Sequence, residues 1–139
     1  MARTRRFTVS LAVLVALAAT TAAASGATSV KEHSGPLSVT FVPSTHTPKV
    51  NAKWPLSVTA TLNGKPAAHA TAAYEFLFGS TIVGPTQYPR SNKHFTFTGH
   101  FSDDLVFPPA SSGEPLTLRV VIKASGHTVN LNWSITSHS

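Results

Sequence analysis

The chain has 139 residues, of which 42% are apolar and 12% charged, with no cysteine and a formal net charge of +6. This length accommodates one domain and a short processed segment, and the ordinary apolar content excludes a globally disordered chain. The lack of cysteine excludes disulfides, cysteine-ligated zinc sites, iron–sulfur centres and thiol nucleophiles.

Residues 1–27 have the pattern of a secretory signal peptide. Three arginines within the first six residues precede an apolar run over 7–19, and small residues fill 22–27. The run of about 13 residues is shorter than the ~20 that a membrane-spanning helix needs, so an uncleaved membrane anchor is the less favoured alternative. We expect a secreted protein whose mature form begins between Ser25 and Thr28 and has no membrane span.

Export changes the charge of the protein. Beyond residue 27, eight Lys and Arg residues stand against five Asp and Glu residues, so the mature chain has a net charge of +3. These residues are scattered singly, with no run of lysines or arginines. The basic composition is therefore not a nucleic-acid-binding pattern.

After the signal peptide, residues 28–36 are mostly polar and small, which predicts a flexible leader. From residue 37 to 139, apolar and polar residues alternate with the period of two that is typical of half-buried strands. Asn63-Gly64 is the clearest turn between two such runs. The alternating apolar residues are Leu37, Val39 and Phe41; Leu56, Val58, Ala60 and Leu62; Tyr74, Phe76 and Phe78; Phe95, Phe97, Phe101, Leu105 and Phe107; Leu116, Leu118, Val120 and Ile122; and Val129, Leu131, Trp133 and Ile135.

Seven or eight short strands separated by turns predict an all-β domain. Since alternation buries one face of each strand, two sheets must cover one another. The strand count and the lack of helices favour an immunoglobulin-like β-sandwich over 37–139, with a closed barrel as the alternative. Trp133 has apolar residues at the same parity along its strand, so its ring is expected between the sheets.

Several short motifs resemble those of a known class of domains. They are Trp54-Pro55-Leu56-Ser57-Val58, Asn63-Gly64-Lys65-Pro66, Phe76-Leu77-Phe78-Gly79, Gly99-His100-Phe101-Ser102-Asp103, Phe107-Pro108-Pro109 and Gly113-Glu114-Pro115-Leu116. Through these turns, strand ends and aromatic residues, the stretch 49–135 resembles small secreted immunoglobulin-like domains of actinobacteria. The resemblance implies the fold and implies no activity, and the cysteine pair of antibody domains is missing.

The sequence carries little catalytic chemistry. Asp103 and Asp104 are adjacent, so in a strand they would point to opposite faces, which is wrong for an acid/base pair. We interpret them as a solvated loop or turn. Motifs of serine hydrolases, zinc proteases and nucleotide-binding proteins are lacking, although serines and histidines are abundant enough for a Ser/His/Asp triad. We expect a protein that is not an enzyme and has no cofactor.

Histidine is the one unusual count, because seven lie beyond the signal peptide. They allow an alternative function as a periplasmic or extracellular copper carrier. If one strand ran through His94 and His100, however, about 20 Å would separate them at ~3.3 Å per residue. We therefore predict no specific metal site. The histidines are His33, His46, His69, His94, His100, His127 and His138.

A binding surface is the remaining functional feature. The segment 84–93 contains two prolines and no periodicity, which predicts a surface loop, and Tyr88 and Arg90 are its candidate contact residues. The stripe of Thr117, Arg119 and Val121, expected to be exposed, is a second candidate face and is more simply interpreted as part of a solvent-facing strand. The sequence thus predicts a non-catalytic secreted binding or structural module whose partner is an unknown protein or the cell envelope.

Overall fold

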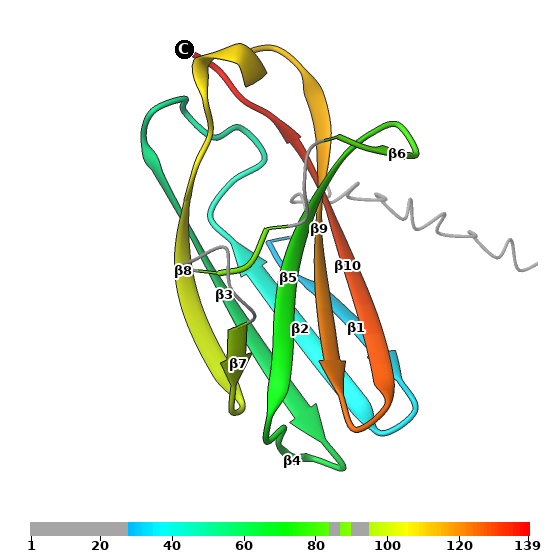
Figure 1. Ribbon diagram of the computed structural model, residues 1–139. Coiled ribbons are helices and arrows are strands. Elements are labelled where there is room, and N and C mark those ends of the chain that lie inside the picture. The colour runs from blue at the N-terminus through cyan, green and yellow to red at the C-terminus, as the bar shows by residue number, and fades with distance from the viewer. Residues whose placement is uncertain (1–27, 84–86, 90–94) are drawn as a thin grey trace, which may run out of the picture.

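The structure is a computed structural model that describes residues 28–83, 87–89 and 95–139. The described strands form two antiparallel sheets that pack face to face (Figure 1). The predicted all-β sandwich is confirmed, and the alternative of a closed barrel is wrong because the strands divide between two sheets. Seven described strands have five residues or more, and three shorter pieces lie at the edges.

The first sheet follows the order β1-β2-β3, and the other edge of β3 is shared by β4 and β8. Asn63 and Gly64 form the turn between β3 and β4, with φ values of 52° and 75°. Both angles are in the left-handed region, as the Asn-Gly pair predicts. The strands are β1 (Val30–Ser34), β2 (Leu37–Pro43), β3 (Lys53–Leu62), β4 (Lys65–Pro66) and β8 (His100–Val106).

The second sheet follows the order β10-β9-β5, and β6 and β7 share the other edge of β5. A single 3₁₀ turn, η1 (Pro109–Ser111), connects β8 of the first sheet to β9 of the second. The strands are β5 (Ala70–Phe78), β6 (Thr81–Ile82), β7 (Phe95–Phe97), β9 (Pro115–Ala124) and β10 (His127–Thr136).

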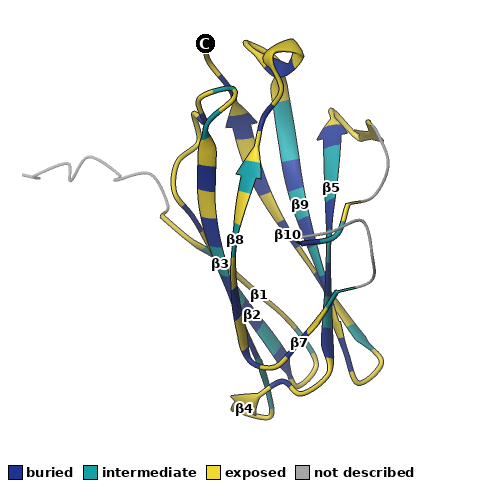
Figure 2. Cartoon of the chain, turned by 60° about the vertical axis from the view of Figure 1, so that its left-hand side comes forward, coloured by how far each residue is buried: buried dark blue, intermediate teal, exposed yellow. Residues whose placement is uncertain are grey.

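The core lies between the sheets, and buried and exposed residues alternate along the strands (Figure 2). β10 is the clearest case, since its odd-numbered residues from Val129 to Ile135 are buried and its even-numbered ones are exposed. Trp133 is 4% exposed and packs edge-on against Phe41, with 6.3 Å between ring centroids. The expectation that its ring lies between the sheets is confirmed.

The expected flexible leader over 28–36 contains strand β1. Its residues pair with β2 from Val30↔Phe41 to Ser34↔Leu37. Three of the five side chains, those of Lys31, Glu32 and His33, are exposed, so no apolar alternation marks the strand. Backbone hydrogen bonds to β2 hold this edge strand in place, and its charged side chains are typical of edges that avoid further pairing.

The run from Phe95 to Phe107 is interrupted, although its shared parity suggests one strand. The chain leaves the second sheet after β7, turns at Thr98 and Gly99, and enters the first sheet as β8. Gly99 has a φ of 69°, and a Cβ there would lie 2.8 Å from Cβ of Pro66. Only glycine combines this conformation with so close a neighbour.

Phe78 is also placed differently from the inward position that alternation along β5 predicts. Its side chain is 51% exposed, whereas the neighbouring Leu77 is buried. The pairing of β5 with β9 ends at Leu77↔Thr117. Phe78 therefore lies beyond the end of the packed core.

Candidate binding site between the sheets

Among the described residues, one side of the sandwich is closed and the other is partly open. On the closed side, β1 lies beside β10 (Figure 1). On the opposite side, β8 and β5 share no ladder. A cavity of about 410 Å³ lies between these two strands and extends towards η1. We call this cavity the inter-sheet opening.

The lining of the inter-sheet opening combines apolar and polar side chains, and its buried part is aromatic. Phe107 is buried at its floor and makes edge-on contacts with Trp54 and Phe76, at centroid distances of 5.6 and 6.0 Å. Val106 at the rim is 60% exposed, and Val83 is also exposed. Exposed valines beside a cavity with an aromatic floor offer apolar surface to a ligand.

A buried tyrosine and an aspartate bring a fixed negative charge to the inter-sheet opening. The hydroxyl of Tyr74 on β5 donates to Oδ2 of Asp103 on β8, at 2.9 Å, and joins the two sheets. The backbone N–H of Asp104 donates to Oδ1 of Asp103, also at 2.9 Å. Because Tyr74 is 1% exposed, its ring is held by packing and fixes the orientation of the carboxylate.

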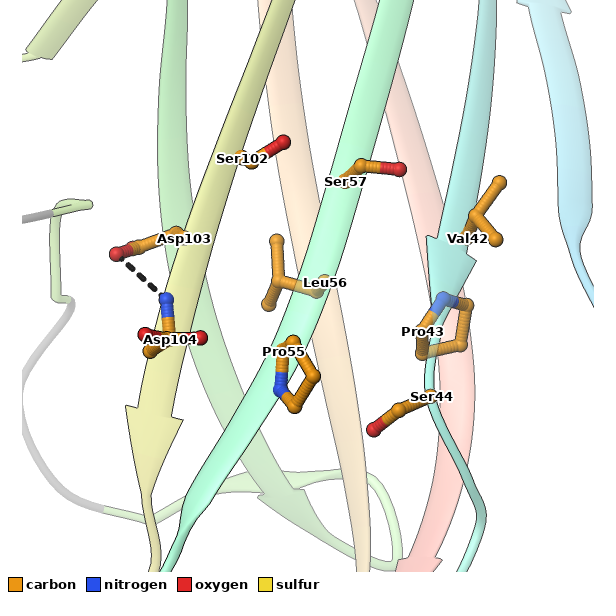
Figure 3. A pocket seen from close by; sticks show the side chains of 9 residues that line it. All are labelled: Val42, Pro43, Ser44, Pro55, Leu56, Ser57, Ser102, Asp103 and Asp104. Carbon is orange, nitrogen blue, oxygen red and sulfur yellow. Dashed lines mark hydrogen bonds between the residues drawn. The ribbon is translucent and has the colours of Figure 1, made fainter.

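The two adjacent aspartates lie within a strand rather than in the solvated loop or turn that the sequence suggests. Asp103 shares the inward parity of Phe101 and Leu105, whereas Asp104 is exposed. They therefore point to opposite faces, as their adjacency predicts. Figure 3 shows the Asp103 side chain projecting past the edge of β8 that faces away from β3. The inward position of Asp103 could have been recognised from this parity.

Tyr88, a candidate contact residue, lines the inter-sheet opening and is half-buried. Gln87 beside it exchanges backbone hydrogen bonds with Tyr74, at 2.6 and 2.9 Å, and Pro89 is fully buried. The described part of the predicted surface loop is therefore held against β5. Arg90, the other candidate, lies outside the described residues.

A second depression, of about 540 Å³, lies on the outer face of the first sheet (Figure 3). It crosses β2, β3 and β8 and includes the exposed side chains of Val42 and Pro55. At its border, Lys53 forms an exposed ion pair of 3.3 Å with Asp104. This surface is bounded by one sheet only, so it lacks the buried aromatic floor of the inter-sheet opening.

The stripe of Thr117, Arg119 and Val121 is half-buried on the outer face of the second sheet. Arg119 forms an ion pair of 3.3 Å with Glu75 and donates from Nε to Asn132 Oδ1 at 3.1 Å. Its charge is thus engaged by neighbouring strands. Such partly exposed pairs contribute little to stability.

The described histidines are dispersed over the molecule. Within the described ranges, no three His, Asp or Glu side chains are grouped as metal ligands, and His94 lies outside those ranges. His46 stacks on Trp133, with 3.7 Å between ring centroids. Its Nδ1 donates to the carbonyl oxygen of Ser134 at 2.7 Å. A nitrogen that donates in this way does not accept the proton of the nearby Ser134 hydroxyl, so the pair lacks the geometry of an activated nucleophile.

The described part of the chain has no helix long and apolar enough to cross a membrane. Comparison of the chain with protein-family models, with curated proteins and with solved structures finds no match.

Proposed function

We propose that the protein is a secreted, non-catalytic, immunoglobulin-like module that binds a protein or cell-envelope partner through the inter-sheet opening. The observation that carries the proposal is the opening itself, which combines an aromatic floor, exposed valines at the rim and a carboxylate held by a buried tyrosine. Cavities of this size that combine apolar walls with a few fixed polar groups are typical binding sites.

The strand order supports the immunoglobulin-like assignment. Strands β2, β3 and β8 lie in one sheet, and β10, β9 and β5 lie in the other. This matches the A-B-E and G-F-C pairing of immunoglobulin-like sandwiches. The motifs over 49–135 that resemble small secreted actinobacterial domains point to the same class.

Secretion is supported by the basic start, apolar run and small residues of the first 27 positions. A copper carrier remains a separate hypothesis, but the described histidines and carboxylates include no group of three that supports it. The inter-sheet opening instead favours an apolar partner surface.

The test of this function uses protein recovered from the culture medium, with its N-terminus sequenced, and measures its retention on envelope fractions of the producing cells. Val106→Asn replaces an apolar side chain at the rim by a neutral polar one and is expected to reduce retention several-fold. Val42→Asn is the matched control, because Val42 is 44% exposed on the outer face of β2. It is expected to retain wild-type binding.

Equal retention of wild type and both variants would contradict binding through the inter-sheet opening. A greater loss with Val42→Asn would place the binding surface on the outer face of the first sheet. An N-terminus at Met1 or Ala2 on a membrane-bound product would contradict secretion.

A further inference from the structure

The inter-sheet opening is negatively charged within a basic protein. Beyond residue 27, the chain has eight Lys and Arg residues against five Asp and Glu residues. Among the described residues that line the opening, the only charged side chains are the two aspartates, Asp103 and Asp104. The electrostatic potential there therefore favours a cationic ligand.

The two aspartates differ in their partners. Asp104 is paired with Lys53 at 3.3 Å. Within the described ranges, no cationic side chain forms an ion pair with Asp103. From the described part of the chain, one donor reaches each of its oxygens, namely the Tyr74 hydroxyl and the Asp104 backbone. Since a carboxylate has about four acceptor positions, Asp103 retains capacity for further donors from a ligand.

The surroundings of Asp103 restrict what kind of cation fits. A bare metal ion needs several ligands, and no suitable group of three occurs in the described part of the chain. Leu105 and Phe107 beside Asp103 form apolar surface that matches an alkyl chain leading to the charge. Val83 and Val106 are exposed and add further apolar surface at the rim. This surface matches the neighbouring residues of a longer ligand better than a single amine.

We infer that the inter-sheet opening takes a lysine or arginine side chain of a peptide segment whose neighbouring residues are apolar. This inference rests on the proposed function and names its ligand. The ammonium or guanidinium group donates to Asp103, and the alkyl stem lies along Leu105 and Phe107. The flanking apolar residues contact Val83 and Val106.

The test measures binding of the dye-labelled pentapeptide Ala-Leu-Lys-Leu-Ala to the purified protein by fluorescence anisotropy. The same peptide with an acetylated lysine is the matched probe, because acetylation removes the charge. Asp103→Asn is expected to weaken binding of the lysine peptide roughly tenfold or more, as a charge-assisted hydrogen bond is lost. Glu114→Gln removes one negative charge from an exposed position outside the opening, and is expected to leave binding unchanged.

A second variant keeps the test decisive if Asp103→Asn perturbs the fold. Val106→Lys adds a positive charge at an exposed rim position. It is expected to lower the affinity for the lysine peptide several-fold more than the affinity for the acetylated peptide. Melting curves for each variant show whether the protein is folded under the binding conditions.

Equal affinity for the lysine and acetyl-lysine peptides would overturn the inference, and so would unchanged binding by folded Asp103→Asn. Displacement of the peptide by hexylamine at equal concentration would identify a free amine as the ligand and overturn the peptide assignment. If the peptide fails to bind while Val106→Asn still reduces envelope retention, the ligand class is wrong and the proposed function stands. If the peptide does not bind and the rim variant does not reduce envelope retention, the proposed function is contradicted as well.

Discussion

Replacing Trp133 by alanine is expected to destabilise the protein by ~3–5 kcal/mol, because it removes a large buried side chain and leaves a cavity. The indole contacts Phe41 edge-on and stacks on His46. Its N–H donates to the carbonyl oxygen of Thr45 at 3.0 Å, and the same oxygen accepts from Trp54 at 3.2 Å. The substitution therefore affects both the core and the loop that follows β2.

Thermal and urea unfolding of the purified protein measure this effect. Trp133→Phe is the control, because it keeps an aromatic ring and loses the indole N–H and part of the volume. It is expected to cost ~1–2 kcal/mol. Against a total stability of ~5–15 kcal/mol, the alanine variant is expected to be partly unfolded or close to it. Melting of Trp133→Ala within a degree or two of wild type would contradict the packing described for the core.

Gly99→Ala is expected to destabilise the protein by ~2–5 kcal/mol. About 1–2 kcal/mol arises from placing a non-glycine residue in the left-handed region, since φ at Gly99 is 69°. Another ~1–3 kcal/mol arises from overpacking, because the new Cβ would lie 2.8 Å from Cβ of Pro66. The backbone of Gly99 also bonds to Ala60 and Ala67, which limits its movement away from the contact.

Gly79→Ala separates the two contributions. Gly79 has a φ of 60°, but a Cβ there would meet no atom within 4 Å. This variant is expected to cost only the ~1–2 kcal/mol of backbone strain. Urea unfolding of both variants gives the difference directly. Equal destabilisation would show that the crossing between β7 and β8 is not tightly packed against Pro66.

The sandwich could be predicted because most of its strands bury one face. The alternation of Leu37, Val39 and Phe41 in β2, and that of the β9–β10 hairpin, appear as buried and exposed residues in the structure. The edge strand β1 could not be recognised in this way, since exposed Lys31 and Glu32 occupy positions where only the backbone is engaged. Backbone pairing leaves little trace in side-chain periodicity.

The crossing between the sheets was hidden for a related reason. Phe97 and Phe101 both face the core and lie 4.7 Å apart between ring centroids, although they belong to different sheets. Inward residues of both sheets point into the same core. The odd-numbered pattern therefore continues across the crossing and suggests a single strand. The glycine at position 99 was the available signal, as an isolated glycine within a strand pattern often marks a break.

The candidate site was partly predictable. Its place in an irregular segment makes Tyr88 a candidate contact residue, and its side chain lines the inter-sheet opening. The hydrogen bond between Tyr74 and Asp103 was not predictable, because the two residues are 29 positions apart in the sequence and belong to different sheets. Such a contact depends on how the sheets stack, which local periodicity does not specify.

The most direct test of the central claim is site-specific photocrosslinking of the protein in the presence of envelope fractions from the producing cells. A photoreactive phenylalanine analogue at Val106 stands at the rim of the inter-sheet opening, and the same analogue at Val42 stands on the outer face of β2. Both positions are exposed, at 60% and 44%. We predict a crosslinked product from position 106 and none from position 42. Crosslinking from position 42 alone, or from neither position while binding persists, would contradict a partner site between the sheets.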